Sequence, residues 1–364
     1  MRLVETASVQ SGTILAKTIY NEKGQVLVSE DVELKAQIIE RLISLGITYL
    51  YIKDKHTDDI IYKNSISDKL RKESLQTIEG TFTQFQKESK METAFVIEKS
   101  TKQLKNIIRQ LLDEIKNNGD LLSLLTDIFS YDQYTFTHSF HVTLYSLAIG
   151  LELKLSPKEL EILGLGAILH DIGKMNVPSE ILLKPGKLTK SEFEVVKKHS
   201  EDGFQILRNV TTIPLLVAHC AYQHHERING SGYPRGISGK EIHRYGKIIA
   251  VADVFDAVTS NRIYRRAMLP HAGLEILYSG VGNLFETHIV EAFRRSVAIY
   301  PVGLTVELND GRKGVVSKQN VGLSDRPIIR ILEEKGRVVK PYELNLAQEL
   351  STMIVNCDTT LGNR

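Results

Sequence analysis

Histidines gather in one part of this chain. Seven of its eleven histidines fall within 88 of the 364 residues: His138, His141, His170, His199, His219, His224 and His225. A lone helical histidine is usually structural, but several near aspartates and glutamates are typical of a metal site. Because such a site would mix imidazole and carboxylate groups without thiolate, it would favour first-row divalent ions.

One of these histidines ends an apolar helical run and is followed by an aspartate and a lysine. The segment AILHDIGK places His170, Asp171 and Lys174 where burial without polar partners would be costly. A metal ion would be such a partner, and the two oxygens of the Asp171 carboxylate can bridge two cations. His170 and Lys174, four residues apart, are expected to share a helix face. The alternative is a solvated helix end with its cationic groups near the C-terminal dipole.

Two adjacent histidines follow a second apolar run, and an aspartate lies inside a third. Helical neighbours diverge by ~100°, so His224 and His225 could both bind metal only if the ions lay around the helix end. Asp253, within IIAVADVF, needs either a salt bridge or a metal ion. Between them lies the glycine-rich loop NGSGYPRG, which is weak support by itself. Residues 226–266 carry eight Lys/Arg against four Asp/Glu, which suits phosphates, although solvated helix faces give similar counts.

The whole chain has the composition of a folded protein of two or three units. It is 42% hydrophobic and 25% charged, and at ~150 residues per domain it exceeds one ordinary core. The net charge of +2 excludes the footprint of a long nucleic acid. No stretch approaches the ~18 apolar residues of a membrane span, and the start lacks a signal-peptide core. The two cysteines, Cys220 and Cys357, suit a reducing compartment, so a cytoplasmic location is expected.

The chain begins with a small unit of mixed structure and a helical segment. Residues 1–62 are predicted to form a small α+β module: a strand over 14–20, a turn, a strand over 25–28, a helix over 31–45 stopped by Gly46, and a strand over 47–52. Residues 63–121 are predicted to be a helical connector. Helices within 63–118 could pair with a second copy or pack on their own domain, and the pattern favours neither.

The rest of the chain divides into a helical domain and a β-rich end, so the predicted fold is multi-domain and mainly α. Residues 122–298 are helical in pattern. Capping boxes at Ser156 and Thr189 mark the starts of the helices expected to carry His170 and His199. Residues 299–364 are predicted to be a small β-rich module with turns at NDG and EEKG.

In their order along the chain, these motifs resemble the HD-GYP family of the HD superfamily of metal-dependent phosphohydrolases. The matching segments are His138 in YTFTHS, HDIGK from 170, His199, HHERINGSGYP from 224 to 234, Asp253, and the basic end SNRIYR from 260. The resemblance covers roughly 125–298, and this ordered combination is highly specific.

The resemblance implies an all-helical HD-GYP domain that hydrolyses cyclic di-GMP to pGpG and, more slowly, GMP. Two ions about 3.5–4 Å apart, iron or manganese, would activate a bridging hydroxide and clamp the attacking and leaving oxygens. By family match, Asp171 bridges the two ions. One ion would be held by His138, His170, Asp171 and Asp253, and its neighbour by Asp171, His199, His224 and His225. A third ion is not expected, because Tyr134 stands where some members have a glutamate.

The resemblance also implies further roles and partners. Lys174 would stabilise charge on the phosphoryl oxygens and, with Arg262 and Arg265, contact the substrate. The GYP loop could dock a diguanylate cyclase, and a homodimer could form through 63–118. His141 and His219 match no family ligand and are expected to be supporting or core residues.

Three alternatives to a cyclic di-GMP phosphodiesterase would each explain part of the sequence. The first is a catalytically silent receptor for a cyclic dinucleotide, against which the intact ligand set argues. The second is an HD hydrolase acting on other nucleotides, which His199 and the HHE and GYP motifs disfavour. A purely structural connector would not explain the histidines. The sequence leaves the choice between cyclic di-GMP and cyclic GMP-AMP open.

Overall fold

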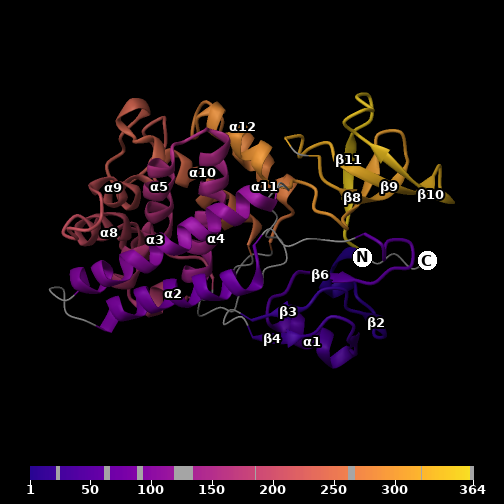
Figure 1. Cartoon of the computed structure of the whole chain (residues 1–364), viewed down its shortest axis with the longest axis horizontal. Coiled ribbons are helices and arrows are strands. Elements are labelled where there is room, and N and C mark those ends of the chain that lie inside the picture. Colours follow the sequence, from indigo (N-terminus) through magenta and orange to yellow (C-terminus); the bar gives the residue numbers. More distant parts are fainter. Residues whose placement is uncertain are drawn as a thin grey trace.

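The computed structural model describes the chain except residues 22–24, 61–65, 88–92, 119–133, 185, 261–266, 321 and 361–364. Most of it is a helical body that surrounds one hydrophobic core (Figure 1). The helices of this body beyond residue 133 are α4 (Tyr134–Glu152), α5 (Pro157–Leu169), α6 (Ser179–Leu182), α7 (Lys190–Lys197), α8 (His199–Leu207), α9 (Leu215–Gln223), α10 (Arg244–Thr259), α11 (Pro270–Ser279) and α12 (Thr287–Ser296). Short 3₁₀ turns occur at Ile172–Asn176 and Gly239–Glu241.

The centre of the body is made by helices that are apolar on nearly every side. In α5 every residue from Leu163 to Leu169 is buried, and α10 buries most of its length in the same core. A helix without a polar face has to lie inside the fold. The predicted capping box at Ser156 is confirmed as the start of α5. These central helices give the site a rigid frame.

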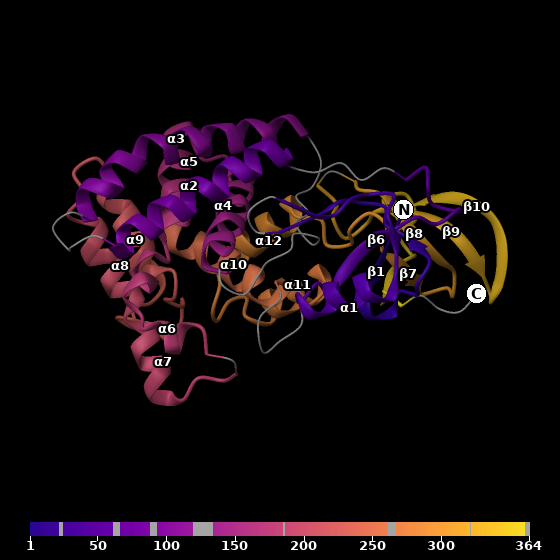
Figure 2. The same cartoon turned by 90° about the horizontal axis from the view of Figure 1, so that it is seen from below.

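The two long helices before this body pack against it. Helices α2 (Asp68–Lys87) and α3 (Thr93–Asn118) lie side by side along α4 and α5 (Figure 2). Ile78 and Leu104 are fully buried in the same core as α4 and α5. The helix pair therefore packs on its own domain. Among its described side chains no large apolar residue is exposed, so the pattern that suggested a dimer is accounted for within one chain.

The N-terminal module is more irregular than its sequence suggested. Its strands pair antiparallel in twos: β1 (Arg2–Glu5) with β6 (Tyr49–Ile52), β2 (Thr13–Ile14) with β5 (Glu33–Leu34), and β3 (Ile19–Tyr20) with β4 (Val26–Val28). The predicted strand over 14–20 is wrong, because it is split between β2 and β3. The helix predicted from 31 begins later, as α1 (Ala36–Ser44), because Asp31 has a φ of 68° and cannot start a helix.

Two other predictions for the N-terminal module, the helix stop at Gly46 and the strand over 25–28, are confirmed. Gly46 ends α1 with a φ of 79°, as predicted. The strand predicted over 25–28 is observed as β4. Most of the turn between β3 and β4 lies outside the described residues. A short 3₁₀ turn at Thr6–Ser8 follows β1.

The C-terminal module is a five-stranded antiparallel sheet. Its strands are β7 (Thr305–Leu308), β8 (Lys313–Lys318), β9 (Ile328–Glu334), β10 (Arg337–Asn345) and β11 (Ile354–Asp358), in the order β10-β9-β8-β7-β11. The two predicted turns are confirmed, since Gly311 and Gly336 both take positive φ at them. β11 was not predicted, and it pairs with β7 from the far end of the module.

The two end modules share a core although they are far apart in sequence. Leu3 and Tyr51 are buried together with Leu304 and Val306, and the Leu3 N–H donates to the Gly303 carbonyl at 2.8 Å. The chain is thus mainly helical, with a β-rich end whose core is shared with the N-terminal module (Figure 1). Domain boundaries at 62, 121 and 298 stay a prediction. None of the described helices is long and apolar enough to cross a membrane.

Candidate metal centre

The site is built around Asp171, at the end of the buried helix α5. The helix ends at Leu169, His170 keeps helical angles as its C-cap, and Asp171 turns away with φ −100° and ψ 8° into the 3₁₀ turn. The expectation that His170 and Lys174 share one helix face is therefore wrong. The turn instead brings the Lys174 ammonium to 2.5 Å from Asp171 Oδ2. His170 and Asp171 are completely buried, which is costly for polar groups without partners.

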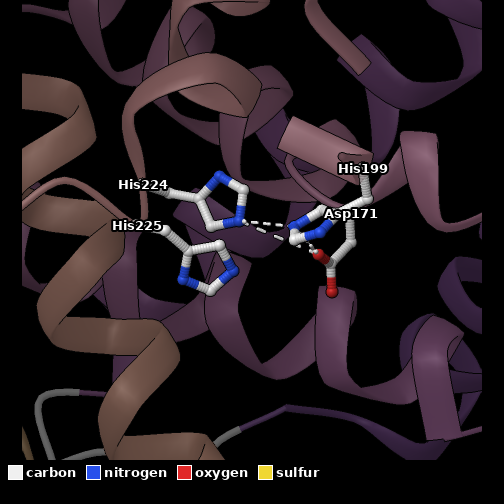
Figure 3. A group of neighbouring side chains, drawn as sticks. All are labelled: Asp171, His199, His224 and His225. Carbon is white, nitrogen blue, oxygen red and sulfur yellow. Dashed lines mark hydrogen bonds and ion pairs between the residues drawn. The ribbon is translucent and has the colours of Figure 1, made fainter. Parts of the chain in front are cut away.

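One oxygen of Asp171 faces the imidazoles of His199 and His224. Its Oδ1 lies 3.4 Å from His199 Nε2 and 3.8 Å from His224 Nε2. The ring of His225 lies 4.0 Å from that of His224, and Figure 3 shows these four side chains gathered around one point. His224 is the C-cap of α9, so both neighbouring histidines reach the site from a helix end. Ligand atoms of Asp171, His199, His224 and His225 lie within 4.8 Å of one another, as a metal site requires.

The other oxygen of Asp171 faces a second pair of histidines. Its Oδ2 lies 3.4 Å from His170 Nε2 and 3.5 Å from His138 Nε2. These three residues form a second group whose ligand atoms lie within 4.8 Å of one another. Asp253 lies beside both groups, because its Oδ1 is 3.0 Å from His138 Nε2 and its Oδ2 is 3.7 Å from His225 Nδ1. The structure thus brings together all seven residues predicted to hold metal.

Three of the histidines are held with Nε2 toward Asp171 by main-chain carbonyls. Nδ1 of His170 donates to the Ala167 carbonyl at 2.7 Å. Nδ1 of His199 donates to the Val196 carbonyl at 2.6 Å, and Nδ1 of His224 donates to the Ala221 carbonyl at 2.9 Å. Because a carbonyl only accepts, the proton resides on Nδ1 and Nε2 keeps its lone pair. This is the tautomer that binds a metal through Nε2.

Two buried atoms at the centre lack a hydrogen-bond partner among the described residues. They are Nε2 of His170 and Oδ1 of Asp171, both acceptors in the arrangement above. Buried acceptors without a donor are unfavourable, whereas a divalent cation beside each of them would satisfy it. The residues therefore fit a metal centre.

The charges of the buried groups favour cation binding. Burial lowers the pKa of His199 to about 4, and it holds the pKa values of His224 and His225 well below 6.5, so all three rings are neutral at pH 7. Burial acts to raise the pKa of Asp171, but the positive charge beside it, including the Lys174 ammonium, outweighs burial and holds that pKa well below 3.8. The site thus offers neutral imidazoles to an ionised carboxylate.

His138 differs in its charge from His199, His224 and His225. Burial acts to lower its pKa, but hydrogen bonds to Asp253 and Asp256 outweigh burial and raise the pKa to about 9. Its two ring nitrogens lie between these two carboxylates, at 3.0 Å from Asp253 Oδ1 and 2.7 Å from Asp256 Oδ2. A divalent cation at Nε2 would take the place of one of these two protons.

The helix that begins at Thr189 was predicted to carry His199, but it ends before that residue. The predicted capping box at Thr189 is confirmed as the start of α7, but α7 ends at Lys197 and His199 is the first residue of α8. The break leaves Val196 O in the last turn of α7, where it can accept from His199 Nδ1.

The GYP loop packs directly on the site. The Tyr233 ring stacks on His225, with centroids 4.6 Å apart and an interplanar angle of 27°. The Glu226 carboxylate, buried under the loop, accepts from the Arg235 main-chain N–H at 2.8 Å. A Cβ on Gly232 would lie 2.4 Å from His225 O, so this close approach requires glycine. Tyr233 and its neighbours thus fix the loop against the metal-facing histidines.

Some predicted residues contribute elsewhere or are not described. Arg262 and Arg265 lie outside the described residues, and so does the side chain of Tyr134, the first residue of α4. His219 packs on Phe204, with ring centroids 5.2 Å apart.

Sequence reasoning assigned no role to Asp256. It is buried on α10, and its carboxylate accepts from Nδ1 of His138 at 2.7 Å and Nδ1 of His141 at 2.9 Å. Matching i,i+3 spacings in the sequence could have indicated this contact. Asp253 and Asp256 lie one turn apart in one apolar helix, and His138 and His141 lie one turn apart in another. Two such pairs suggest that the helices face each other.

Comparison with known proteins agrees with this site. The HD domain family matches residues 103–289, slightly more than half of the 364 residues. The chain belongs to the HD domain family, and the resemblance to HD-GYP phosphodiesterases inferred from the motifs is confirmed. The matched segment begins within α3, which agrees with the packing of that helix on the body.

Several curated relatives share the helical body. Cyclic di-GMP phosphodiesterase PA4108 of Pseudomonas aeruginosa is 39% identical over 215 residues, covering 58% of this chain and 51% of the relative. The response regulator RpfG of Xanthomonas campestris, a cyclic di-GMP phosphodiesterase, is 44% identical over 148 residues, covering 40% and 39%. The 3'3'-cGAMP-specific phosphodiesterase 3 of Vibrio cholerae is 37% identical over 168 residues, covering 46% and 36%. The chain spans about half or less of the length of each.

Proposed function

We propose that this chain is a divalent-metal-dependent phosphodiesterase that hydrolyses cyclic di-GMP to pGpG and, more slowly, to GMP. The observation that carries this proposal is the buried carboxylate of Asp171, whose two oxygens face two separate groups of imidazoles. One carboxylate between two ligand groups suits a pair of cations that share a bridge. The relatives named as cyclic di-GMP phosphodiesterases support the substrate.

The ligand roles follow from which oxygen each residue faces. His199 and His224, on the Oδ1 side, and His225 beside them would hold one ion; His138 and His170, on the Oδ2 side, and Asp253 would hold the other. When bound, two iron or manganese ions would supply Lewis acidity to a phosphoryl oxygen and activate water at neutral pH. The helix-end carbonyls orient the imidazoles of His170, His199 and His224, so little reorganisation is needed.

Lys174 would stabilise negative charge on the phosphoryl oxygens. Its side chain is 17% exposed beside Asp171, which is 1% exposed, so the ammonium lies between the buried ligands and solvent. A cation fixed there can contact an anionic substrate without displacing a ligand.

Lys174→Ala is therefore expected to lower kcat by about 10²-fold while the metal content stays near that of the wild type. Steady-state kinetics and elemental analysis of the same sample would measure both. If the variant lost metal as completely as Asp171→Ala, Lys174 would instead serve to hold the carboxylate in place.

Arg262 and Arg265 are proposed to bind the second phosphate or the bases. They follow α10, which carries Asp253, and planar guanidinium groups suit both tasks. Arg262→Ala and Arg265→Ala, alone and together, are expected to raise KM by about tenfold or more with metal still bound. Unchanged cyclic di-GMP hydrolysis in the double variant would leave these residues as surface charge.

The first product should accumulate before the second. Tyr134 begins α4 four residues before His138, where a carboxylate could hold a third ion. A phenol, with an ordinary pKa near ~10, replaces a carboxylate poorly toward such ions. The flexible linear pGpG should then be held less firmly than the ring, so GMP should lag. A chromatographic time course tests the order, and GMP formed without a lag would contradict it.

A substrate panel tests the proposed function. The metal-reconstituted protein is incubated with cyclic di-GMP, cyclic GMP-AMP and deoxynucleoside triphosphates, with a chelator-treated sample as the control. Cyclic di-GMP should be cleaved, and cyclic GMP-AMP is the second candidate because the Vibrio cholerae relative is specific for it. Cleavage of the triphosphates alone would support another HD hydrolase, and binding without cleavage would support a receptor. A homodimer through 63–118 and a cyclase docking on the GYP loop stay predictions.

A further inference from the structure

Asp256 is placed to control how one metal-facing histidine presents its ring. It lies one turn after Asp253 on α10 and is 1% exposed. Its Oδ2 accepts from His138 Nδ1 at 2.7 Å, and its Oδ1 accepts from His141 Nδ1 at 2.9 Å and from the Ser260 hydroxyl at 3.0 Å. We propose that Asp256 is a positioning residue that holds His138 with Nε2 directed at the metal centre. This inference rests on the proposed metal function.

The need for such a residue follows from where His138 lies in its helix. His170 and His224 cap helix ends, and His199 follows one, so each can use a nearby carbonyl left free by the end of its helix. His138 lies one turn inside α4, where main-chain carbonyls are engaged in the helix itself. Its Nδ1 therefore needs an acceptor from another element, and α10 supplies it.

The geometry at His138 shows what the acceptor achieves. With Nδ1 donating to Asp256, Nε2 lies 3.0 Å from Asp253 Oδ1 and 3.5 Å from Asp171 Oδ2, on the side where the other imidazoles converge. The contacts from His141 and the Ser260 hydroxyl are both on Oδ1, which leaves Oδ2 to His138. Asp253 thus contacts Nε2 of His138, on the side of the metal centre, and Asp256 contacts Nδ1 of the same ring, on the opposite side.

A purely structural role would make a different prediction. Asp256 could instead serve only to accept hydrogen bonds from two buried imidazoles and so join α4 to α10. Loss of either hydrogen bond would then weaken metal binding to the same extent. His141 provides the matched control, because it is buried and bonds to the same carboxylate, through Oδ1 rather than Oδ2. His141→Ala removes a contact on Oδ1 and leaves the contact between His138 and Oδ2.

The test is Mn²⁺ binding to the metal-free protein, followed by the electron paramagnetic resonance signal of free Mn²⁺. Asp256→Asn is expected to weaken binding by about 10–100-fold, and His141→Ala by less than about threefold, even where both lower the melting temperature of the metal-free protein. Equal weakening in both variants, or weakening below about threefold in Asp256→Asn, would overturn the positioning role. No Mn²⁺ binding by the wild type would instead sink the proposed function.

A second measurement covers the case in which Asp256→Asn does not fold. Long-range ¹H–¹⁵N spectra of ¹⁵N-histidine-labelled wild-type protein, assigned with His138→Gln, report which ring nitrogen carries the proton. With Zn²⁺ bound, His138 is expected to be protonated at Nδ1 and metal-shifted at Nε2. A proton on Nε2, or a metal shift on Nδ1, would overturn the inference.

Discussion

Asp171→Ala is expected to abolish hydrolysis of cyclic di-GMP, to below about one thousandth of the wild-type rate, and to lower the metal content together with it. Among the residues that the structure describes, its carboxylate is the one group that belongs to both sets of ligand atoms. Without it the imidazoles of His138, His170, His199 and His224 lose the anion they face. Lys174 would remain as a cation beside them and oppose metal binding further.

The control for this variant is Asp113→Ala, an exposed aspartate on α3. It removes the same charge from the chain and should keep wild-type activity and metal. Kinetics and elemental analysis on both variants, with circular dichroism to confirm folding, give the comparison. A folded Asp171→Ala protein that keeps two ions, or a tenth of the activity, would contradict the bridging role.

Gly173→Ala is expected to damage the site through sterics alone. A Cβ at Gly173 would lie 2.0 Å from His199 O and 2.6 Å from Gly203 N, and both are main-chain atoms that cannot rotate away. The methyl group would push the start of α8 from the 3₁₀ turn and lengthen the 3.4 Å approach of His199 to Asp171. Overpacking of this kind costs about 1–3 kcal/mol or more. Metal binding should weaken along with stability.

Gly80→Ala is the matched control, because its Cβ would meet nothing within 4 Å on α2. A glycine replaced by alanine inside a helix should stabilise it by about 0.5–1 kcal/mol. Thermal unfolding of both variants, with and without metal, measures the difference. The steric account is wrong if Gly173→Ala melts within a degree of the wild type and binds metal as well.

The side chains that form the site could be predicted from the sequence, but the residue that holds one of them in place could not. Residue types and their order are local properties of the sequence, so His170, Asp171 and the HHE segment could be identified as candidate ligands without a fold. Asp256 was missed because its role depends on α4 lying against α10, a long-range contact. The i,i+3 pairs on those two helices were the available signal.

Local backbone breaks were harder to predict than helices. Apolar periodicity located α5, but it gave no sign that the helix ends at Leu169 and tightens into a 3₁₀ turn. That turn, rather than a continuous helix face, brings Lys174 to Asp171. In the same way, β11 and the core shared by the two end modules depend on pairing between distant segments, which the spacing of apolar residues does not encode.

The proposed metal-dependent hydrolysis is tested most directly by the rate of cyclic di-GMP cleavage plotted against moles of metal per chain. The metal-free protein is titrated with Mn²⁺ or, anaerobically, with Fe²⁺, and linear product is quantified at each step. We expect no cleavage without metal and a maximum at about two ions per chain, because Asp171 joins two ligand groups. Cleavage that persists in metal-free protein, or fully loaded protein that leaves cyclic di-GMP intact, would contradict it.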